Sequence, residues 1–229
     1  MAGFEGFRPA AQHFFRDLAA NNNRDWFLAN KAVHEAEIRA PLAALLQALS
    51  FAFATQDVPL TADPKRSMFR INRDVRFSHD KSPYKTNAGA VMSRDGTKTS
   101  RGLIYIQPVS AESAFMAMGF YQSEPADLAA LRQAMVAAPK DWTKLEARLA
   151  KAGLALGREE ALQRLPKGFE AMAGSPVAEA LKLRNLIVRR PLTPAQVQRA
   201  DLVEEVVAFA IAGLPLLRFG WEAFANAKA

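Results

Sequence analysis

The chain has 229 residues, of which 50% are hydrophobic and 23% are charged, so it has the composition of a globular protein rather than a disordered or collagen-like one. The length is sufficient for one large domain or two small ones. No cysteine is present, which excludes disulfides, thiol catalysis and a cysteine zinc site. The N-terminus lacks the pattern of a secretory signal, and the apolar stretch Val206–Leu217 is shorter than the roughly 20 residues of a membrane span. We therefore expect a cytoplasmic protein that does not contact a membrane.

The net charge of +7 is concentrated in one segment. The chain has 30 Lys and Arg against 23 Asp and Glu, and residues 65–101 alone hold ten basic and three acidic residues. The rest of the chain, with 20 of each, is neutral. The basic residues of this segment are Lys65, Arg66, Arg70, Arg73, Arg76, Lys81, Lys85, Arg94, Lys98 and Arg101. Attraction to an anion should therefore be focused there.

The N-terminal region has a helical pattern. Apolar residues at helical spacing over 11–18 predict a short amphipathic helix. Asn21–Asn23 then offers a helix end and a new N-cap, because asparagine tolerates left-handed backbone and its side chain accepts from free N–H groups. A second helical pattern runs over 27–49, and Pro41 should kink or restart that helix.

The middle of the chain is expected to form strands. Met68–Phe77 alternates between apolar and polar residues, as a half-buried strand does. Asn87–Met92, Leu103–Gln107 and Ala114–Phe120 are apolar and suited to strands, and Arg94-Asp95-Gly96 is a turn signal between two of them. We expect an antiparallel sheet of about four strands.

Helical patterns return after Ser123 and continue to the C-terminus. Residues 153–176 are looser, and Leu186–Val188 is a candidate for one more strand. Thr193–Gln196 has a cap residue, a proline at the first helical position and a glutamine three residues after the cap, which predicts a helix start. The final helices, around 203–211, are apolar on nearly all sides and are expected to lie in the core.

This order of helices, then strands, then helices predicts an α+β fold rather than alternating βαβ units. In this fold an antiparallel sheet over about residues 68–120 packs with N- and C-terminal helices. We expect residues 1–229 to form a single α+β domain.

Two stretches resemble the signature of a known family. One is N-N-N-R-D-W-F at Asn21–Phe27, and the other is F-R-I-N-R-D-V-R-F-S-H-D-K-S-P-Y-K-T at Phe69–Thr86. Weaker similarities continue at Gly102–Pro108, Leu165–Phe169 and Leu181–Asn185. With these motifs the chain resembles, over almost its whole length, the uncharacterised and mostly bacterial domain of unknown function 2461 family. The resemblance implies a single α+β domain and supplies no reaction.

The sequence carries no established catalytic or metal-binding motif. It has no P-loop, no G-x-S-x-G and no G-x-G-x-x-G. His13, His34 and His79 are not at metal-ligand spacing, and His34 falls on an apolar helix stripe where a packed histidine is expected. Tyr105 and Gln107 depart from the family pattern, in which relatives tend to have a histidine and an acid. Catalytic residues and cofactors are therefore unassigned, and no metal site is expected.

The central motif places charged side chains on one face of the expected strand. Alternation over Phe69–Phe77 puts four polar residues on the same face, Arg70, Asn72, Asp74 and Arg76. Arg73 would share the apolar face, which is costly unless its charge is paired or the strand has a bulge.

One interpretation of this motif is an anion-binding pocket. Guanidinium groups bind phosphate or carboxylate through paired hydrogen bonds, and Asp74 would orient one of the arginines. Lys81, Tyr84 and Lys85 lie on the following loop and could close the pocket. The candidate ligand-binding residues are thus Arg70, Arg73, Asp74, Arg76, Lys81, Tyr84 and Lys85. The alternative is a structural network in which Asp74 and Asp80 hold the arginines in place.

The scarcity of acids gives two predictions. Arg70, Arg73 and Arg76 should not all find acidic partners within the chain. Because Asp74 lies among these arginines and Asp95 in an expected exposed turn, Asp74→Asn should damage folding or binding more than Asp95→Asn does.

Asn23, Arg24 and Trp26 form a second group of candidate ligand-binding residues. They lie at an expected helix N-terminus, where backbone N–H groups favour an anion. The alternative, which the residue types favour, is a helix cap with Trp26 and Phe27 as core anchors.

The expected partner is a phosphate-bearing anionic small molecule such as a nucleotide. A nucleic-acid-binding module is the alternative, because the basic segment lies near Phe69, Phe77 and Tyr84. Phe69 and Phe77 fall on the side expected to be buried, which argues against base stacking on them. A third alternative is a structural or interaction domain. A closed pocket would favour a small ligand, an open basic stripe a nucleic acid, and fully paired arginines a structural role. The oligomeric state is not predicted.

Overall fold

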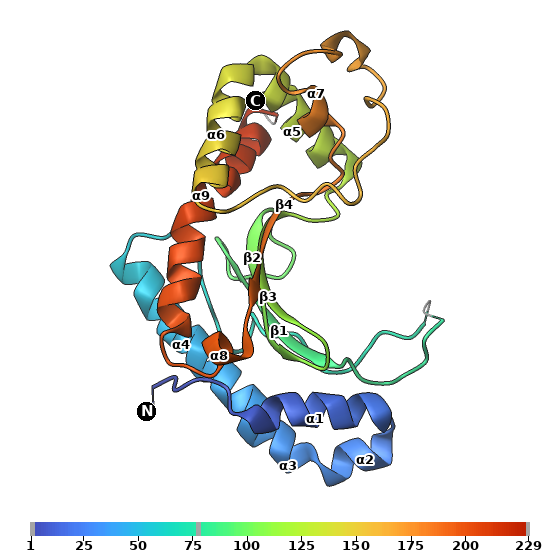
Figure 1. Ribbon diagram of the computed structural model, residues 1–229, viewed down its shortest axis with the longest axis vertical. Coiled ribbons are helices and arrows are strands. Elements are labelled where there is room, and N and C mark those ends of the chain that lie inside the picture. Colours follow the sequence, from blue (N-terminus) through green and yellow to red (C-terminus); the bar gives the residue numbers. More distant parts are fainter. Residues whose placement is uncertain (1–2, 77–78, 228–229) are drawn as a thin grey trace. The chain divides into compact units, whose positions relative to one another are not determined.

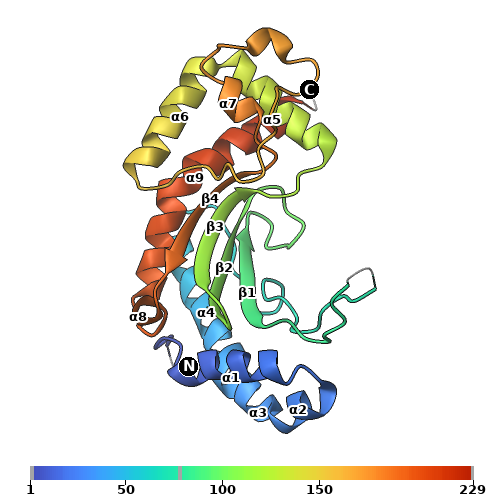
Figure 2. The same ribbon diagram turned by 45° about the vertical axis from the view of Figure 1, so that its right-hand side comes forward.

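The computed structural model describes residues 3–76 and 79–227. It contains a four-stranded antiparallel sheet with helices before and after it, which confirms the expected α+β fold (Figure 1). Each strand pairs with the next one along the chain, in the order β1-β2-β3-β4 (Figure 2). The strands are β1 (Asn87–Ser93), β2 (Leu103–Ser110), β3 (Ala114–Phe120) and β4 (Leu186–Leu192).

The helices fall into three groups along the chain. Before the sheet come α1 (Pro9–Ala20), α2 (Arg24–Ala29), α3 (Lys31–Val33), the π-helix η1 (His34–Arg39) and α4 (Ala40–Thr55). Between β3 and β4 come α5 (Pro125–Ala137), α6 (Pro139–Lys151), the 3₁₀ helix η2 (Glu170–Met172) and α7 (Ala178–Leu181). After β4 come α8 (Pro194–Val197) and α9 (Leu202–Asn226). Helices α1, α5, α6 and α8 each begin with a proline, whose fixed φ suits the first helical position and whose missing N–H is not needed there.

Contacts divide the chain into two compact units. The first lies within residues 1–100, 104–116 and 191–208, and the second within 101–103, 117–190 and 209–229. The single domain expected for residues 1–229 stays a prediction.

In the first unit, the N-terminal helices form as their sequence predicts. Ala11, Phe14, Phe15 and Leu18 are the buried residues of α1, which confirms the amphipathic stripe. The helix ends at Ala20 with Asn21 as its C-cap, and the side chain of Asn23 then caps α2 by accepting from the N–H of Trp26 at 3.0 Å. Phe27 is buried and Trp26 is half-buried. These residues therefore match the expected alternative of a helix cap followed by aromatic residues that pack against the core.

The helical run from α3 to α4 contains a π-helix immediately before Pro41. The N–H of Ala40 donates to the carbonyl of Glu35, five residues back rather than four. Pro41 has no N–H, and in a regular α-helix its ring would clash with the carbonyl of Glu37. The wider turn accommodates the proline, and α4 restarts with Pro41 in its first turn.

The continuous helix Lys31–Thr55 is long and apolar enough to cross a membrane by length and composition alone, a candidate that sequence analysis missed. Six of its side chains are buried, which is also the pattern of a core helix in a soluble protein; they are Ile38, Leu42, Leu45, Leu46, Leu49 and Phe53. The cytoplasmic location stays a prediction.

The strand expected at Met68–Phe77 is not a sheet strand in the described residues, and Phe77 lies outside them. Its described residues form two isolated antiparallel bridges, Met68 with Ala90 and Asn72 with Tyr84. Asn72 lies four positions after Met68, but their partners Tyr84 and Ala90 are six positions apart, so the segment that leads into β1 bulges by two residues. The fourth strand of the sheet is instead β4, where only a candidate strand at 186–188 was expected.

The expected alternation of side chains nevertheless persists over 70–76. Arg70, Asn72, Asp74 and Arg76 are exposed, while the residues between them are half-buried. Phe69 was expected on the buried side, and this is wrong, because 40% of its surface is exposed. It lies beside the bulge, where regular pairing ends.

The second unit has its own core. Trp142 on α6 is fully buried and packs on Phe219 of α9, with ring centroids 4.9 Å apart. Arg132 on α5 donates to the carbonyls of Leu181 and Leu183 at 2.9 and 3.1 Å, which satisfies backbone groups at and after the end of α7. None of the candidate ligand-binding residues lies in this unit.

Candidate functional site

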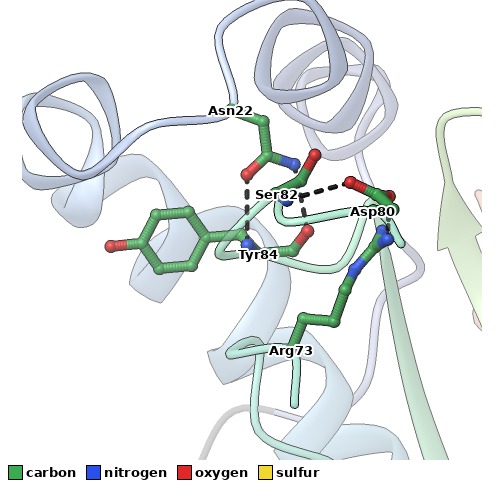
Figure 3. Close-up of polar contacts among 5 residues, drawn as sticks. All are labelled: Asn22, Arg73, Asp80, Ser82 and Tyr84. Carbon is green, nitrogen blue, oxygen red and sulfur yellow. Dashed lines mark hydrogen bonds and ion pairs between the residues drawn. The ribbon is translucent and has the colours of Figure 1, made fainter. Parts of the chain in front are cut away.

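The two motifs that carry the family resemblance meet in the first unit. The side-chain amide of Asn22, between α1 and α2, donates to the carbonyl of Tyr84 at 3.0 Å and accepts from its N–H at 3.1 Å (Figure 3). The ring of Tyr84 is buried and stacks on Phe27 of α2, with centroids 4.3 Å apart. Tyr84 therefore anchors the segment before β1 to the N-terminal helices.

An ion pair holds together the base of the loop between Arg73 and Pro83. The Arg73 guanidinium pairs with Asp80, whose other carboxylate oxygen accepts from the N–H of Ser82 at 2.9 Å (Figure 3). The N–H of Arg73 donates to the carbonyl of Pro83 at 2.9 Å. Hydrogen bonds from Ser82, followed in weight by the charge of Arg73, hold the pKa of Asp80 below its usual range.

Further along the loop, Asp74 and Arg76 pair with each other. The two guanidinium-to-carboxylate bonds measure 3.0 and 2.7 Å, and they lower the pKa of Asp74. Lys81 donates to the carbonyl of Val75 at 2.9 Å. These contacts agree with the alternative in which Asp74 and Asp80 hold the arginines in place, and they provide carboxylate partners for Arg73 and Arg76.

Arg70 is different. Within the described residues it forms no ion pair with a carboxylate, so the three arginines do not all find acidic partners, as expected from the sequence. Arg70 instead lines a cleft of about 710 Å³ between the segment 64–72, the residues that lead into β1, and the helices α3, η1 and α4. All of its lining residues belong to the first unit.

The walls of this cleft are strongly basic. Six lining residues are basic and one, Glu35, is acidic. The basic residues are Lys31, Arg39, Lys65, Arg70, Lys85 and Lys98. Arg39 pairs with Glu35 at 3.5 Å, and the other five form no ion pair with a carboxylate in the part of the chain that the structure describes. The cleft therefore holds an excess of positive charge that the described residues do not neutralise.

The excess is greatest around Phe69. The ammonium groups of Lys85 and Lys98 lie 5.3 and 5.4 Å from the centre of its ring, within the range of cation–π contacts. The two nitrogens are therefore no more than about 11 Å apart, and at 11 Å like charges repel by about 1.5 kcal/mol at an effective dielectric of about 20. Burial, followed by the charges of Arg70, Lys98 and Arg73, lowers the pKa of Lys85.

His34 lies at the π-helical wall of the cleft. It packs against Phe14 and Phe27, at centroid distances of 5.6 and 5.5 Å, which confirms the packed histidine expected from the sequence. Its Nδ1 is buried with no hydrogen-bond partner among the described residues. Burial lowers the pKa of His34, opposed by the charge of Glu35 and assisted by that of Arg39.

The structure separates the predicted site residues into four places. Arg70 and Lys85 line the cleft. Tyr84 is buried against Phe27, and the loop network contains Arg73, Asp74, Arg76 and Lys81. Asn23, Arg24 and Trp26 belong to the cap and first turn of α2, which has only six residues, and none of them lines the cleft.

Sequence reasoning missed other members of the cleft. Lys31 and His34 face it from one helical run, and Lys65 and Lys98 face it from opposite ends of the basic segment. Lys65 and Lys98 were counted in the basic segment 65–101, but neither was predicted to bind a ligand. No signal in the sequence connected Lys31 to them, because the contact depends on how the helix packs.

The fold and the cleft define an α+β protein with an uncompensated basic site built from its N-terminal helices and the segment before β1. The chain belongs to the family described as "conserved hypothetical protein (DUF2461)", which matches residues 10–219 and confirms the resemblance. No curated protein and no solved structure matches it.

Proposed function

We propose that the protein binds a phosphate-bearing anionic small molecule in the cleft lined by Arg70, Lys85 and Lys98. The observation that carries the proposal is the group of five basic lining residues without a carboxylate partner among the described residues. Repulsion between these cations is relieved when an anion binds, and an arginine can hold phosphate through two parallel hydrogen bonds.

The size and apolar lining of the cleft favour a small ligand over a polymer. A volume of about 710 Å³ lies within the range of small-molecule sites, roughly 300–1,000 Å³. Ile38, Met68, Phe69 and Ile71 contribute apolar surface between the basic residues. A ligand with an anionic group and an apolar or planar part, such as a nucleotide, matches both features.

Calorimetry and thermal shift measurements with phosphate, pyrophosphate, nucleotides and a DNA duplex at two salt concentrations test the proposal. We expect phosphate-bearing ligands to bind and to raise the melting temperature, since a ligand of the folded state stabilises it by about 2.7 kcal/mol at 100 times Kd. Micromolar duplex binding with a steep salt dependence and no nucleotide binding would support the nucleic-acid alternative instead. Binding of neither would favour a structural role for the basic residues.

Variants test the location of the site. Arg70→Met and Lys98→Met should each weaken phosphate binding about tenfold or more, the effect of losing one charge-assisted hydrogen bond. Arg24→Met is the matched control, because Arg24 is exposed in the same unit but lies outside the cleft. Equal weakening by Arg24→Met would show that the ligand responds to net charge rather than to this cleft.

A further inference from the structure

We propose that Lys85 is a reactive amine that forms an imine with phosphate-bearing aldehydes or ketones bound in the cleft. Its role rests on the proposed function, because the phosphate group would be held by Arg70 and the other cations. It goes beyond anion binding by assigning a covalent step to one atom, the Nζ of Lys85.

The position of Lys85 differs from that of the other cleft lysines. Lys31, Lys65 and Lys98 are exposed, whereas Lys85 is half-buried at the bulge before β1. Its Nζ donates to the carbonyl of Arg70 at 3.2 Å and has no carboxylate partner among the described residues. An amine is held at the wall of the cleft, therefore, without a counter-ion that would stabilise its protonated form.

The surroundings of Lys85 favour the neutral amine, which is the nucleophilic form. Partial burial and the neighbouring charges of Arg70, Lys98 and Arg73 lower its pKa. Desolvation and an adjacent cation are the two devices by which proteins activate lysine toward carbonyl groups. Both are present at Lys85.

The chemical step is an addition followed by loss of water. After the ammonium releases a proton to solvent, the Nζ lone pair attacks the carbonyl carbon, and the C=O π electrons move to oxygen to give a carbinolamine. The carbinolamine then loses water and forms the C=N bond, so one amine and one carbonyl compound give one imine and one water. No oxidant or reductant is needed.

A phosphate on the same ligand makes this addition efficient. The guanidinium of Arg70 cannot lose its proton, so it remains a fixed anchor for the phosphate while the amine reacts. Such anchoring converts a bimolecular addition into an effectively unimolecular one. The ligand class is therefore a phosphorylated aldehyde or ketone rather than a simple carbonyl compound.

Reductive trapping with pyridoxal 5′-phosphate tests the proposal, because this probe carries an aldehyde and a phosphate. Borohydride reduces the imine to a stable secondary amine, and peptide mass spectrometry locates it. We expect Lys85 to be labelled about tenfold or more faster than the exposed Lys167, with pyrophosphate suppressing the reaction at Lys85. Pyridoxal without the phosphate should label Lys85 much more slowly, and equal labelling by the two probes would contradict the proposal.

Two variants separate this proposal from the proposed function. Lys85→Arg keeps a positive charge but has no nucleophilic amine, so total labelling by pyridoxal 5′-phosphate should fall to that of the exposed lysines, while its pyrophosphate affinity is expected to change because residue 85 lines the cleft. Arg70→Met keeps the amine, so its labelling by pyridoxal 5′-phosphate should fall toward that by pyridoxal. If the wild type binds pyrophosphate but the label spreads evenly over surface lysines, the reactive amine is wrong and anion binding stands. If pyrophosphate does not bind and Lys85 is not preferred, both proposals fail.

Discussion

The side-chain amide of Asn22 satisfies both backbone groups of Tyr84, a residue 62 positions away in the sequence. The pair of hydrogen bonds copies the pattern that a neighbouring strand would provide. It holds Tyr84 where its ring stacks on Phe27, and it fixes the backbone immediately before Lys85. The position of the cleft lysine therefore depends on a turn between two N-terminal helices.

Removing this amide should destabilise the fold. Asn22→Ala leaves the part-buried N–H and carbonyl of Tyr84 without partners, and we expect a loss of about 1–3 kcal/mol in the free energy of unfolding, measured with urea. Asn21→Ala is the control, because that amide donates only to the carbonyl of Asp17 within its own helix. Equal losses in the two variants would show that the contact between the two motifs contributes nothing specific.

The hydrogen bonds of Asp74 and Asp95 favour Asp95 as the more important of the two for stability, which is the reverse of the order expected from the sequence. Asp95 Oδ1 accepts from the Ser93 hydroxyl at 3.1 Å and from the N–H and hydroxyl of Thr97 at 2.9 and 2.8 Å. Asp74 is exposed, as is Asp95, and among the described residues its side chain bonds to one residue, Arg76. We therefore expect Asp95→Asn to be the more destabilising substitution, by about 1 kcal/mol or less after solvent screening.

The pH dependence of this effect has a definite sign. Hydrogen bonds from Thr97 lower the pKa of Asp95, so its contribution is complete above the unfolded value of about 3.9 and is lost as the pH falls through the lower folded value. The melting temperatures of wild type and Asp95→Asn should thus differ near neutral pH and converge in acid. A difference that persists unchanged at low pH would show that the carboxylate charge is not its source.

Gly119 on β3 should not tolerate a side chain. Its φ is +138°, and a Cβ there would overlap the carbonyl oxygen of Leu186 on β4. Gly119→Ala must separate the two strands, and we expect a loss of roughly 4 kcal/mol or more, seen as a large fall in melting temperature or soluble yield. Gly153→Ala provides the comparison, because its φ is +69° but no atom lies within 4 Å, so only the backbone cost of about 1–2 kcal/mol applies. Similar melting temperatures for the two variants would contradict the close approach.

His34 should make stability sensitive to mild acid. Because burial lowers its pKa, the unfolded chain binds a proton more readily than the folded one, and stability falls as the pH drops from about 6.5 toward the folded value. We expect His34→Gln to lose less stability than wild type between about pH 7.5 and pH 5, measured as urea midpoints. An unchanged slope in His34→Gln would show that the histidine is not responsible.

Local features of the fold could be predicted from the sequence because they depend on neighbouring residues. The buried stripe of α1, the Asn23 cap and the capping box of Thr193 with Gln196 all formed as expected. Alternation correctly assigned the exposed face of 70–76, since side-chain direction in an extended chain is a local property. The partner of that segment is not local, and its pairing fails to continue as a ladder because of the two-residue bulge.

The candidate site shows the same division. The charge count found the basic segment, and two of its predicted residues, Arg70 and Lys85, line the cleft. Arg73 pairs with Asp80 and Arg76 pairs with Asp74, so Arg70 is the central arginine that has no carboxylate partner among the described residues. The sequence could not show which of the three arginines this would be. Lys31 enters the site only because its helix packs against the segment 64–72, a contact for which the sequence has no periodic pattern.

The π-helix His34–Arg39 links the length of this turn to the proline that follows it. Each of its hydrogen-bonded turns encloses one residue more than a turn of α-helix. Because the wide turn absorbs that extra residue, deleting one residue within 34–39 would restore α-helical hydrogen bonding and leave the segments on either side in nearly the same rotation about the helix axis. Lys31 and the buried leucines of α4 would keep their faces, but the ring of Pro41 would then clash with the carbonyl four residues before it. Relatives with one residue fewer in this turn would therefore be expected to have a residue other than proline at the position of Pro41.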